Sequence, residues 1–280
     1  MLRIGLWAAV GVLTATLAGC QGIFAPRERL LQAPWQLDSE EQAALDRVLQ
    51  AREAKNVDLK AFASRFTRWE YDPIFGPSNA PRFVDEGEIE YVAPDKMVFR
   101  ILKTHKDGQT VPIEPERAEH WVRDGKSLYY HDHETEKLTE LQLPPSWQEK
   151  VCNWGPFLLL FETKAERLKE LFFIRIVTPP GAEGEIWLEA YPRFEEEACN
   201  FKRAELILKT KDMMPSAMQY YAPNGKNRTA YAFDEKSTSV SKKRAAGLAP
   251  AHGVRRVVFR RRCAGVNPAA RPRRRPLRGS

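Results

Sequence analysis

The sequence predicts a mainly β protein built on one strongly curved antiparallel sheet of about ten strands, with two or three helices. The first observation is the alternation of apolar and polar residues, clearest at 88–91, which is typical of strands with one face on a core. The second is a pair of tight-turn dipeptides, Asp124-Gly125 and Asn224-Gly225, set between alternating segments. The third is length, because 280 residues are enough for one large domain with a sizeable core.

The central stretch, residues 87–143, predicts four successive strands of this sheet. Alternation resumes after the Pro94-Asp95 turn, and a hairpin forms around Asp124-Gly125. Five further strands are expected downstream, at 173–177, 185–191, 203–210, 217–222 and 228–233.

Helices are predicted before and after the central strands. Ser39, with Gln42 three residues later, forms a capping-box pattern. Four side chains then continue at helical spacing to about residue 55, namely Leu45, Val48, Leu49 and Arg52. Residues 59–71 are ambiguous and are interpreted as a helix end followed by a strand from about Phe66. Thr163 and Glu166 predict a second capped helix that ends at Leu171, after the dense apolar run 156–161.

Charge divides the chain into a body and a tail. Residues 236–280 hold fourteen of the 44 Lys and Arg and no Asp or Glu, so residues 1–235 carry 30 basic against 37 acidic side chains, a net charge of −7. The tail is rich in Arg, Pro, Ala and Gly and cannot bury enough apolar surface to fold alone. A reading-frame slip, a disordered tail and a functional basic arm remain open for it.

The first twenty residues resemble a bacterial lipoprotein signal. A charged start and an apolar run of fourteen residues, short for a membrane span, end in Leu17-Ala18-Gly19-Cys20, a lipobox pattern. We expect Cys20 to become the lipidated first residue of the mature chain, with enough acyl chains, such as palmitate, for stable membrane anchoring. Gln21 in place of an Asp favours the outer membrane over the inner one. Residues 21–38 are expected to be a tether and 39–235 the folded domain.

Two cysteines of the body, Cys152 and Cys199, are candidates for a disulfide, since export makes one chemically accessible. Two separate thiols are the alternative, because nothing in the sequence brings the pair together.

Tests for catalytic motifs are negative. Gly125-Lys126-Ser127 ends like a P-loop, but His120 stands where that motif needs glycine. His120, His131 and His133 could share a face, yet they lie at a polar turn, so we interpret them as solvated and predict no metal site. The sequence therefore predicts no enzyme, no cofactor and no nucleic-acid partner.

Inward-facing apolar side chains are the candidates for lining a ligand cavity, since a curved sheet with a helix across its mouth can enclose one. Plain core packing is the alternative for each. By alternation the candidates are Ile89, Tyr91, Phe99, Ile101, Tyr129, Leu141, Leu143, Ile186, Leu188 and Leu206.

The order of several short motifs resembles the LolA/LolB superfamily of bacterial lipoprotein carriers, and more closely a planctomycete-type lipoprotein branch of it. The resemblance covers about residues 39–234. The motifs are Phe66, Gly87-x-Ile89, Pro94, the run 124–130, the run 156–159, the strand end at 188–192 and Asn224-Gly225.

The resemblance implies a half-open antiparallel barrel whose helices form a lid over acyl chains. Carriers similar to this chain usually have Arg before the proline that matches Pro94, where it helps latch the lid, and here Ala93 stands in that position. The closing strand expected after Phe233 is not recognisable.

Two functions follow as expectations. The first is a monomeric, membrane-anchored carrier that binds a lipid or an acylated protein and faces the periplasm. The second is a non-catalytic scaffolding lipoprotein of the envelope with a filled core.

Overall fold

The computed structural model describes residues 30–76, 79–143, 145, 156–241 and 254–257. The helices are α1 (Ser39–Asn56), α2 (Phe157–Phe161), α3 (Ala165–Leu171) and α4 (Glu195–Ala198). The first seven strands are β1 (Ala61–Tyr71), β2 (Phe83–Val92), β3 (Lys96–Lys106), β4 (Gln109–Pro112), β5 (Glu119–Asp124), β6 (Ser127–Asp132) and β7 (Lys137–Gln142). The others are β8 (Phe172–Ile176), β9 (Glu185–Pro192), β10 (Arg203–Lys209), β11 (Pro215–Tyr221), β12 (Arg228–Phe233), β13 (Ser239–Ser241) and β14 (Val254–Val257).

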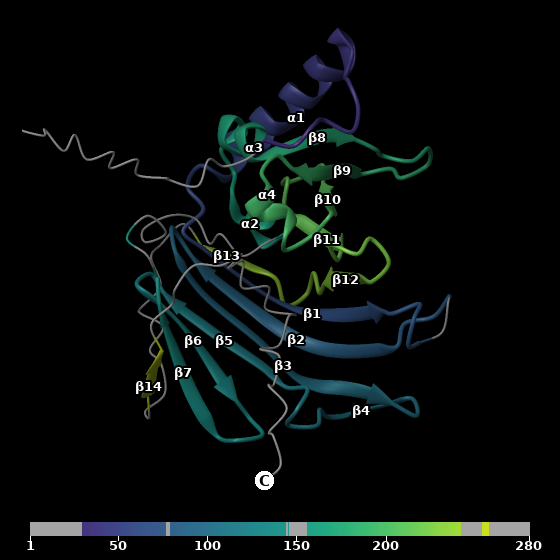
Figure 1. Cartoon of the computed structure of the whole chain (residues 1–280). Coiled ribbons are helices and arrows are strands. Elements are labelled where there is room, and N and C mark those ends of the chain that lie inside the picture. The colour runs from purple at the N-terminus through teal and green to yellow at the C-terminus, as the bar shows by residue number, and fades with distance from the viewer. Residues whose placement is uncertain (1–29, 77–78, 144, 146–155, 242–253, 258–280) are drawn as a thin grey trace, which may run out of the picture.

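These strands form one open, curved sheet. Its order runs β14-β7-β6-β5-β3-β2-β1-β12-β11-β10-β9-β8, with β4 added to β3 and β13 to β1, and every pairing is antiparallel except β14 with β7. The two ends do not pair, so the barrel is incomplete. Figure 1 shows β8–β12 rising above β1–β7, with α2 between the two halves and α1 and α3 beside β8. The predicted half-open sheet with covering helices is therefore confirmed.

The central stretch contains more strands than predicted. Six strands, β2 to β7, take the place of the expected four. In addition, β1 begins at Ala61, so the helix end predicted after residue 59 is wrong. The side chains that β1 buries are Phe62, Ser64, Phe66 and Arg68. Because two of these four are polar, the period-two pattern of the strand was hidden in the sequence.

Both predicted helix caps lie one residue or more from their observed positions. Asp38, not Ser39, caps α1: its carboxylate accepts hydrogen bonds from the backbone N–H groups of Glu40 and Glu41, each at 2.8 Å. The Glu41 carboxylate accepts one in return from the Asp38 N–H at 3.0 Å. For α3, neither Thr163 nor Glu166 forms a cap. The Ala165 N–H donates instead to a carboxylate of α1, that of Glu53, at 3.0 Å.

The folded part extends past both predicted domain boundaries. At the C-terminal side, β13 pairs with Ala61–Ala63 of β1, within the segment expected to be a tail, and supplies a strand after Phe233. At the N-terminal side, part of the predicted tether packs on β9. The Leu31 N–H donates to the Arg193 carbonyl at 2.7 Å, and the ring of Trp35 lies 5.0 Å from that of Tyr191.

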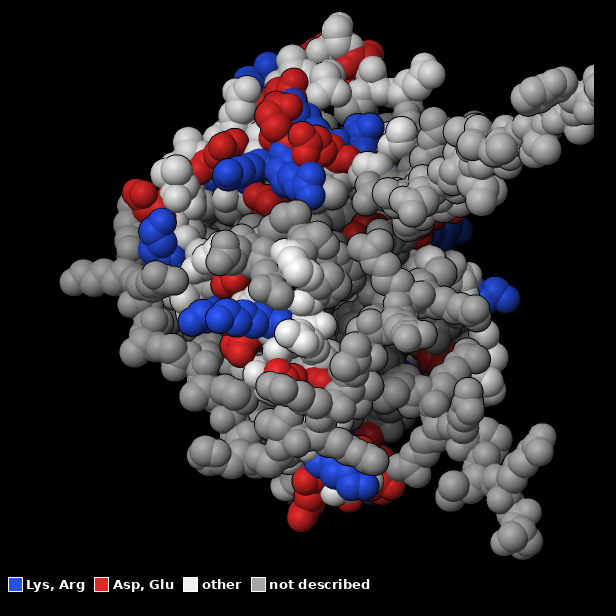
Figure 2. Space-filling view, turned by 60° about the vertical axis from the view of Figure 1, so that its left-hand side comes forward, with Lys and Arg blue, Asp and Glu red and all other residues white. Residues whose placement is uncertain are grey.

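The surface of the described part carries interspersed charges. On the face in Figure 2, blue Lys and Arg side chains lie among red Asp and Glu side chains rather than in a separate patch. Lys169, for example, joins α3 to α1 through Asp46 at 3.1 Å. Within the described residues, no helix is long and apolar enough to cross a membrane.

Candidate functional site

The concave face of the sheet, on the side of α2, is lined by apolar side chains. Of the ten predicted inward residues, six are almost fully buried in one core cluster: Ile89, Tyr91, Phe99, Ile101, Leu188 and Leu206. Three more are partly buried and pack against that cluster: Leu141, Leu143 and Ile186.

Tyr129 is placed differently. It pairs with Val122 and Glu140 across the neighbouring strands, and its hydroxyl donates to the Asp124 carboxylate at 3.2 Å. Its side chain therefore lies on the opposite face from Leu128, and the inward assignment is corrected. Alternation could not set the phase of this strand, because three apolar or aromatic residues follow one another at 128–130.

Helix α2 fills the concave face. Its sequence is Phe-Leu-Leu-Leu-Phe, and all five side chains are buried. Phe161 stacks on Tyr91 of β2, with ring centroids 4.2 Å apart and planes 15° apart. Phe157 contacts Phe99 of β3 at 5.5 Å and Tyr231 of β12 at 5.6 Å. This short apolar helix therefore bridges both halves of the sheet.

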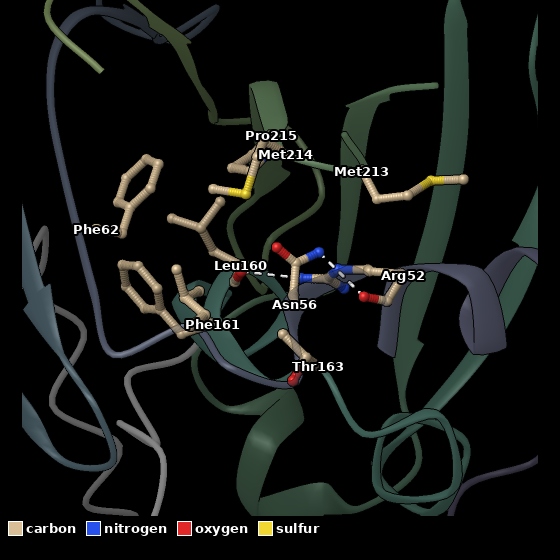
Figure 3. Close-up of a pocket in the computed structure, with 10 residues that line it drawn as sticks. Arg52, Asn56, Phe62, Leu160, Phe161, Thr163, Met213, Met214 and Pro215 are labelled. Atoms are coloured by element: carbon tan, nitrogen blue, oxygen red, sulfur yellow. Dashed lines mark hydrogen bonds between the residues drawn. The ribbon is translucent and has the colours of Figure 1, made fainter. Parts of the chain in front are cut away.

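Arg52 of α1 holds α2 in place. Its Nη2 donates to the backbone carbonyls of Leu159 at 2.9 Å and Leu160 at 2.8 Å, while no side chain caps the start of α2. Figure 3 shows Arg52 reaching toward Leu160, while the side-chain amide of Asn56 donates to the Arg52 carbonyl. The last carbonyls of a helix have no intrahelical donor, so a cation there is favourable. Burial lowers the pKa of Arg52 to about 10, partly opposed by the carboxylate of Glu162, and leaves it protonated at neutral pH.

Helix α1 thus contacts both segments that follow the central strands. Arg52 donates hydrogen bonds to carbonyls at the end of α2, and the neighbouring Glu53 accepts one from the first N–H of α3. The cation lies at a helix C-terminus and the anion at a helix N-terminus, which is the favourable sign for each. The pair makes α1 a clamp over α2 and α3.

Little space is left between the clamp and the sheet. A cavity of about 10 Å³ lies among Arg52, Phe62, Leu160 and Met214, the region drawn in Figure 3. A space of that size holds about one water molecule at most. The apolar interior around α2 is therefore packed with protein side chains.

A buried ionic cluster borders this apolar face. Arg68 of β1 is 2% exposed and pairs with Asp85 at 2.7 Å and with Glu119. Arg117 completes the cluster through Asp85 at 2.9 Å. Burial alone would lower the pKa of Arg68, but these carboxylates raise it well above its usual value. Every charge of the cluster has an opposite charge within contact, as buried ions require.

The three histidines set aside in the sequence lie together. One ligating nitrogen from each of His120, His131 and His133 lies within 4.8 Å of the others, and all three side chains are partly buried. The interpretation of a solvated turn did not anticipate this grouping. The metal-ligand spacing of the sequence was its only signal.

Two predicted sites fall outside the described residues. Cys20, the expected lipid attachment point, and Cys152, the expected partner of Cys199, both lie in segments that the structure leaves out. Lipidation and the disulfide stay predictions.

Sequence reasoning missed the parts that close the concave face. The run 156–161 was seen as apolar but was not assigned to the interior. Arg52 was seen only as a residue at helical spacing. Its position on the same stripe as Leu45 and Leu49 was the available signal, because an arginine on an apolar stripe needs a buried acceptor.

No protein-family model matches the sequence, and no curated protein matches it. Solved structures to which this chain is similar include an uncharacterized conserved protein from Thermus thermophilus, 12% identical, with 76% of this chain and 99% of that chain covered and a TM-score of 0.41. A putative outer membrane lipoprotein-sorting protein domain from Vibrio parahaemolyticus is 9% identical, with 70% and 91% covered and a TM-score of 0.36. A LolA superfamily protein from Nitrosomonas europaea is 8% identical, with 68% and 91% covered and a TM-score of 0.30.

The LolA superfamily, which the sequence motifs resemble, is thus among the groups of solved structures to which this chain is similar. Each identity is below 25% and each TM-score below 0.5, so these similarities carry no inference about a ligand or an activity.

Proposed function

We propose that this chain is a lipid-anchored, periplasm-facing protein of the bacterial envelope that binds an acyl chain, of a lipid or an acylated protein, and catalyses no reaction. The observation that carries the proposal is α2, a five-residue apolar helix inserted into a concave apolar face and held by a side chain of another helix. An acyl chain would take the place of α2.

The exchange sets the loss of the contacts of α2 against the burial of the acyl chain. A helix of five residues is too short to be stable alone, so α2 keeps its position only through tertiary contacts. Displacing it uncovers the faces of Tyr91, Phe99 and Tyr231. Each methylene of an incoming chain that leaves water contributes about 0.8 kcal/mol, so a long acyl chain can offset the loss of the α2 contacts.

Arg52 sets how readily α2 leaves. Its hydrogen bonds to Leu159 and Leu160 break when α2 moves, and their acceptors are backbone atoms, so the restraint is independent of the side chains of α2. In carriers that the sequence resembles, an arginine before the proline matching Pro94 helps latch the lid. Here Ala93 stands in that position, and Arg52 takes a comparable role from α1.

The membrane half of the proposal rests on the lipobox. Cys20 carries the lipid, and Gln21 after it favours the outer membrane. From Leu30 onward the chain packs on the domain, so the tether is shorter than the composition suggests. A lipid on Cys20 would keep the domain near the bilayer that supplies or receives the acyl ligand.

The test compares two cations of α1. Arg52→Met removes the restraint on α2, whereas Lys55→Ala removes a similar contact to the carbonyls of Thr210 and Lys211, away from α2. A hydrogen bond from a charged donor is worth about 1.5–3 kcal/mol, so Arg52→Met favours the open form and increases the affinity for a fluorescent fatty acid about tenfold or more. Lys55→Ala leaves the affinity unchanged.

Two negative results together would contradict the proposal. If neither the wild type nor Arg52→Met takes up the fatty acid, and solvent extraction of protein purified from native membranes yields no bound lipid by mass spectrometry, the chain is no lipid binder.

One observation favours the second candidate, a scaffolding lipoprotein with a filled core. The cavity beside α2 measures only about 10 Å³, whereas ligand sites usually hold a few hundred. A scaffold keeps α2 in place permanently. Hydrogen exchange separates the two, because a carrier exposes the amides of α2 far more often than those of β2, while a scaffold protects both alike.

A further inference from the structure

Three histidines meet on the face of the sheet that points away from α2. His120 lies in β5, His131 in β6, and His133 directly follows β6. Their neighbours Trp121 and Tyr130 point to the other face, where the two rings pack 4.4 Å apart. The cluster is thus separated from the concave face by the thickness of the sheet.

Strand pairing places the three side chains together. Trp121 pairs with Tyr130 across β5 and β6, so the preceding His120 and the following His131 are opposite one another on the outer face. His133 comes two residues after His131 and returns to the same face. The rings of His120 and His133 stack at 5.9 Å with planes 24° apart, and His131 meets both edge-on.

The distances fit a metal ion. All three ligating nitrogens lie within 4.8 Å of one another, and Nδ1 of His131 is 3.3 Å from Nε2 of His133. Two imidazole nitrogens bound tetrahedrally to one zinc ion at about 2.0–2.1 Å lie roughly 3.3–3.4 Å apart. That pair already has the spacing of one edge of a zinc tetrahedron, and His120 needs only a small side-chain movement to complete a face.

A simple hydrogen bond between two neutral imidazoles would also give a spacing of 3.3 Å. It accounts for His131 and His133 alone. It leaves unexplained why a nitrogen of a third imidazole, from another strand, lies within 4.8 Å of the other two. A shared ion accounts for all three.

We propose that His120, His131 and His133 bind a divalent transition metal ion, zinc being the natural choice, with three imidazole ligands and an exchangeable fourth position. Imidazole nitrogens suit this class of ion. Three protein ligands leave the fourth position of a tetrahedron to water or an anion. The site is distinct from the acyl-binding face and does not depend on that function.

Charged side chains of both signs lie near the cluster. Arg100 of β3 pairs with His120 across the two strands, so its positive charge lies beside the cluster. Arg100 itself is paired with Glu88 at 2.8 Å and Glu90 at 3.2 Å, which offsets its repulsion of a metal ion. Asp132 stands between His131 and His133 in the chain and adds a negative charge next to the cluster.

The experiment is a calorimetric titration of the full chain with Zn²⁺ at neutral pH. We expect one ion per chain. His120→Gln, His131→Gln and His133→Gln should each lower the affinity by at least the roughly 10–100-fold that loss of a mere outer-shell partner costs. The matched control is His105→Gln, since His105 lies on β3, is paired with Glu86 at 2.9 Å and stands outside the cluster. It should bind zinc like the wild type.

Cysteines are the competing ligands, and Co²⁺ distinguishes them. Cobalt held by imidazoles gives visible absorption without the charge-transfer band of a cobalt thiolate. A thiolate band, or wild-type zinc affinity in all three cluster variants, would overturn the proposal. Circular dichroism of the three single variants checks their folding, and because each side chain is partly exposed, all three should keep the wild-type spectrum.

Discussion

Two buried tyrosines, Tyr220 and Tyr231, make the stability of this domain sensitive to alkaline pH. They lie on neighbouring strands, with rings 6.3 Å apart. Burial raises the pKa of Tyr220 to about 12, and the pKa of Tyr231 is raised well above its usual value by burial and by Tyr220. Both hydroxyls therefore stay protonated in the folded chain at a pH where they would ionise in the unfolded chain.

The direction in which pH changes the free energy of unfolding follows from which state binds the proton. Above about pH 10 the unfolded state releases the proton of Tyr220 while the folded state keeps it, so the free energy of unfolding falls between pH 10 and about 12. One pKa unit corresponds to about 1.4 kcal/mol, so the shift of about two units in Tyr220 gives a loss of roughly 3 kcal/mol. Urea unfolding at successive pH values measures it. Tyr220→Phe should show a visibly shallower decline, and an equal decline would refute the assignment.

Gly87 is required by close packing rather than by its backbone angle. A Cβ there would lie 2.4 Å from the Arg100 carbonyl and 2.5 Å from Cζ of Phe66, whose ring stacks on Phe99 at 5.3 Å. Since the carbonyl belongs to a paired strand, neither atom can move freely. Gly87→Ala should reduce the free energy of unfolding by about 1–3 kcal/mol, the usual cost of overpacking.

The comparison for this prediction is Gly108→Ala. Nothing lies within 4 Å of a Cβ at Gly108, and only its positive φ of 76° opposes the change. Its cost should be about 1 kcal/mol or less. Chemical denaturation of the two variants side by side checks the order, and the reverse order would contradict the packing account.

At the scale of single elements, two neighbouring residues, Asp38 and Ser39, are alternative N-caps of α1, and mutation distinguishes them. Asp38→Ala removes the acceptor of two backbone N–H groups and should cost about 1 kcal/mol of stability. Ser39→Ala lies inside the helix, where alanine is favourable, and should cost nothing. Thermal unfolding of both variants measures this, and a larger loss for Ser39→Ala would restore the cap that the sequence pattern suggested.

The elements most open to prediction are those whose buried side chains on the inward face are apolar. β9, β10 and β12 were expected within two residues of their observed ends, because alternation and the Asn224-Gly225 turn set their limits. β1 was obscured because Ser64 and Arg68 occupy inward positions. Their partners are distant in sequence: Thr238 contacts Ser64 at 2.9 Å, and Asp85 pairs with Arg68. Local pattern cannot reveal such partners.

The same limit applies to the candidate site. Nine of the ten residues that alternation predicted to face inward do so. Tyr129 faces the other way, because residues 128–130 are all suited to a core and alternation cannot set the phase there. The clamp between α1 and α2 joins residues more than one hundred positions apart, Arg52 and Leu159, through a backbone carbonyl. No side-chain pattern encodes a backbone acceptor, so this contact required the fold.

At the scale of the whole molecule, the curvature of the sheet could be predicted from the sequence, but what fills its concave face could not. A twisted sheet of many strands curls for reasons common to all sheets. Whether the concave face holds a ligand or a segment of the same chain depends on α2. Helix propensity alone does not predict that this segment lies there. The packed face around Phe161 is therefore the reason why the proposed mechanism is exchange with a segment of the same chain rather than uptake into a preformed cavity.

The C-terminal limit of the domain provides the last prediction. A chain that ends at Ser241 keeps β13, including the bond from the Lys60 N–H to the Ser241 carbonyl at 2.9 Å. A chain that ends at Glu235 loses it, together with the hydroxyl of Ser237 that accepts from the Arg65 N–H at 2.9 Å. Several hydrogen bonds at about 1 kcal/mol each disappear, so the shorter chain should be less stable by roughly 2–4 kcal/mol.

The longer chain is the control, because it lacks the same basic residues beyond 241 that the shorter chain lacks. It should unfold at the denaturant concentration of the full-length protein, since β14 adds only four residues at the far edge of the sheet, beside β7. Equal stability of the two truncated chains would place the boundary before residue 236, where composition suggests it. A loss confined to the shorter chain places residues 236–241, which include Ser237 and β13, in the domain, because the two chains differ only in these residues and in no part of the Arg-rich segment.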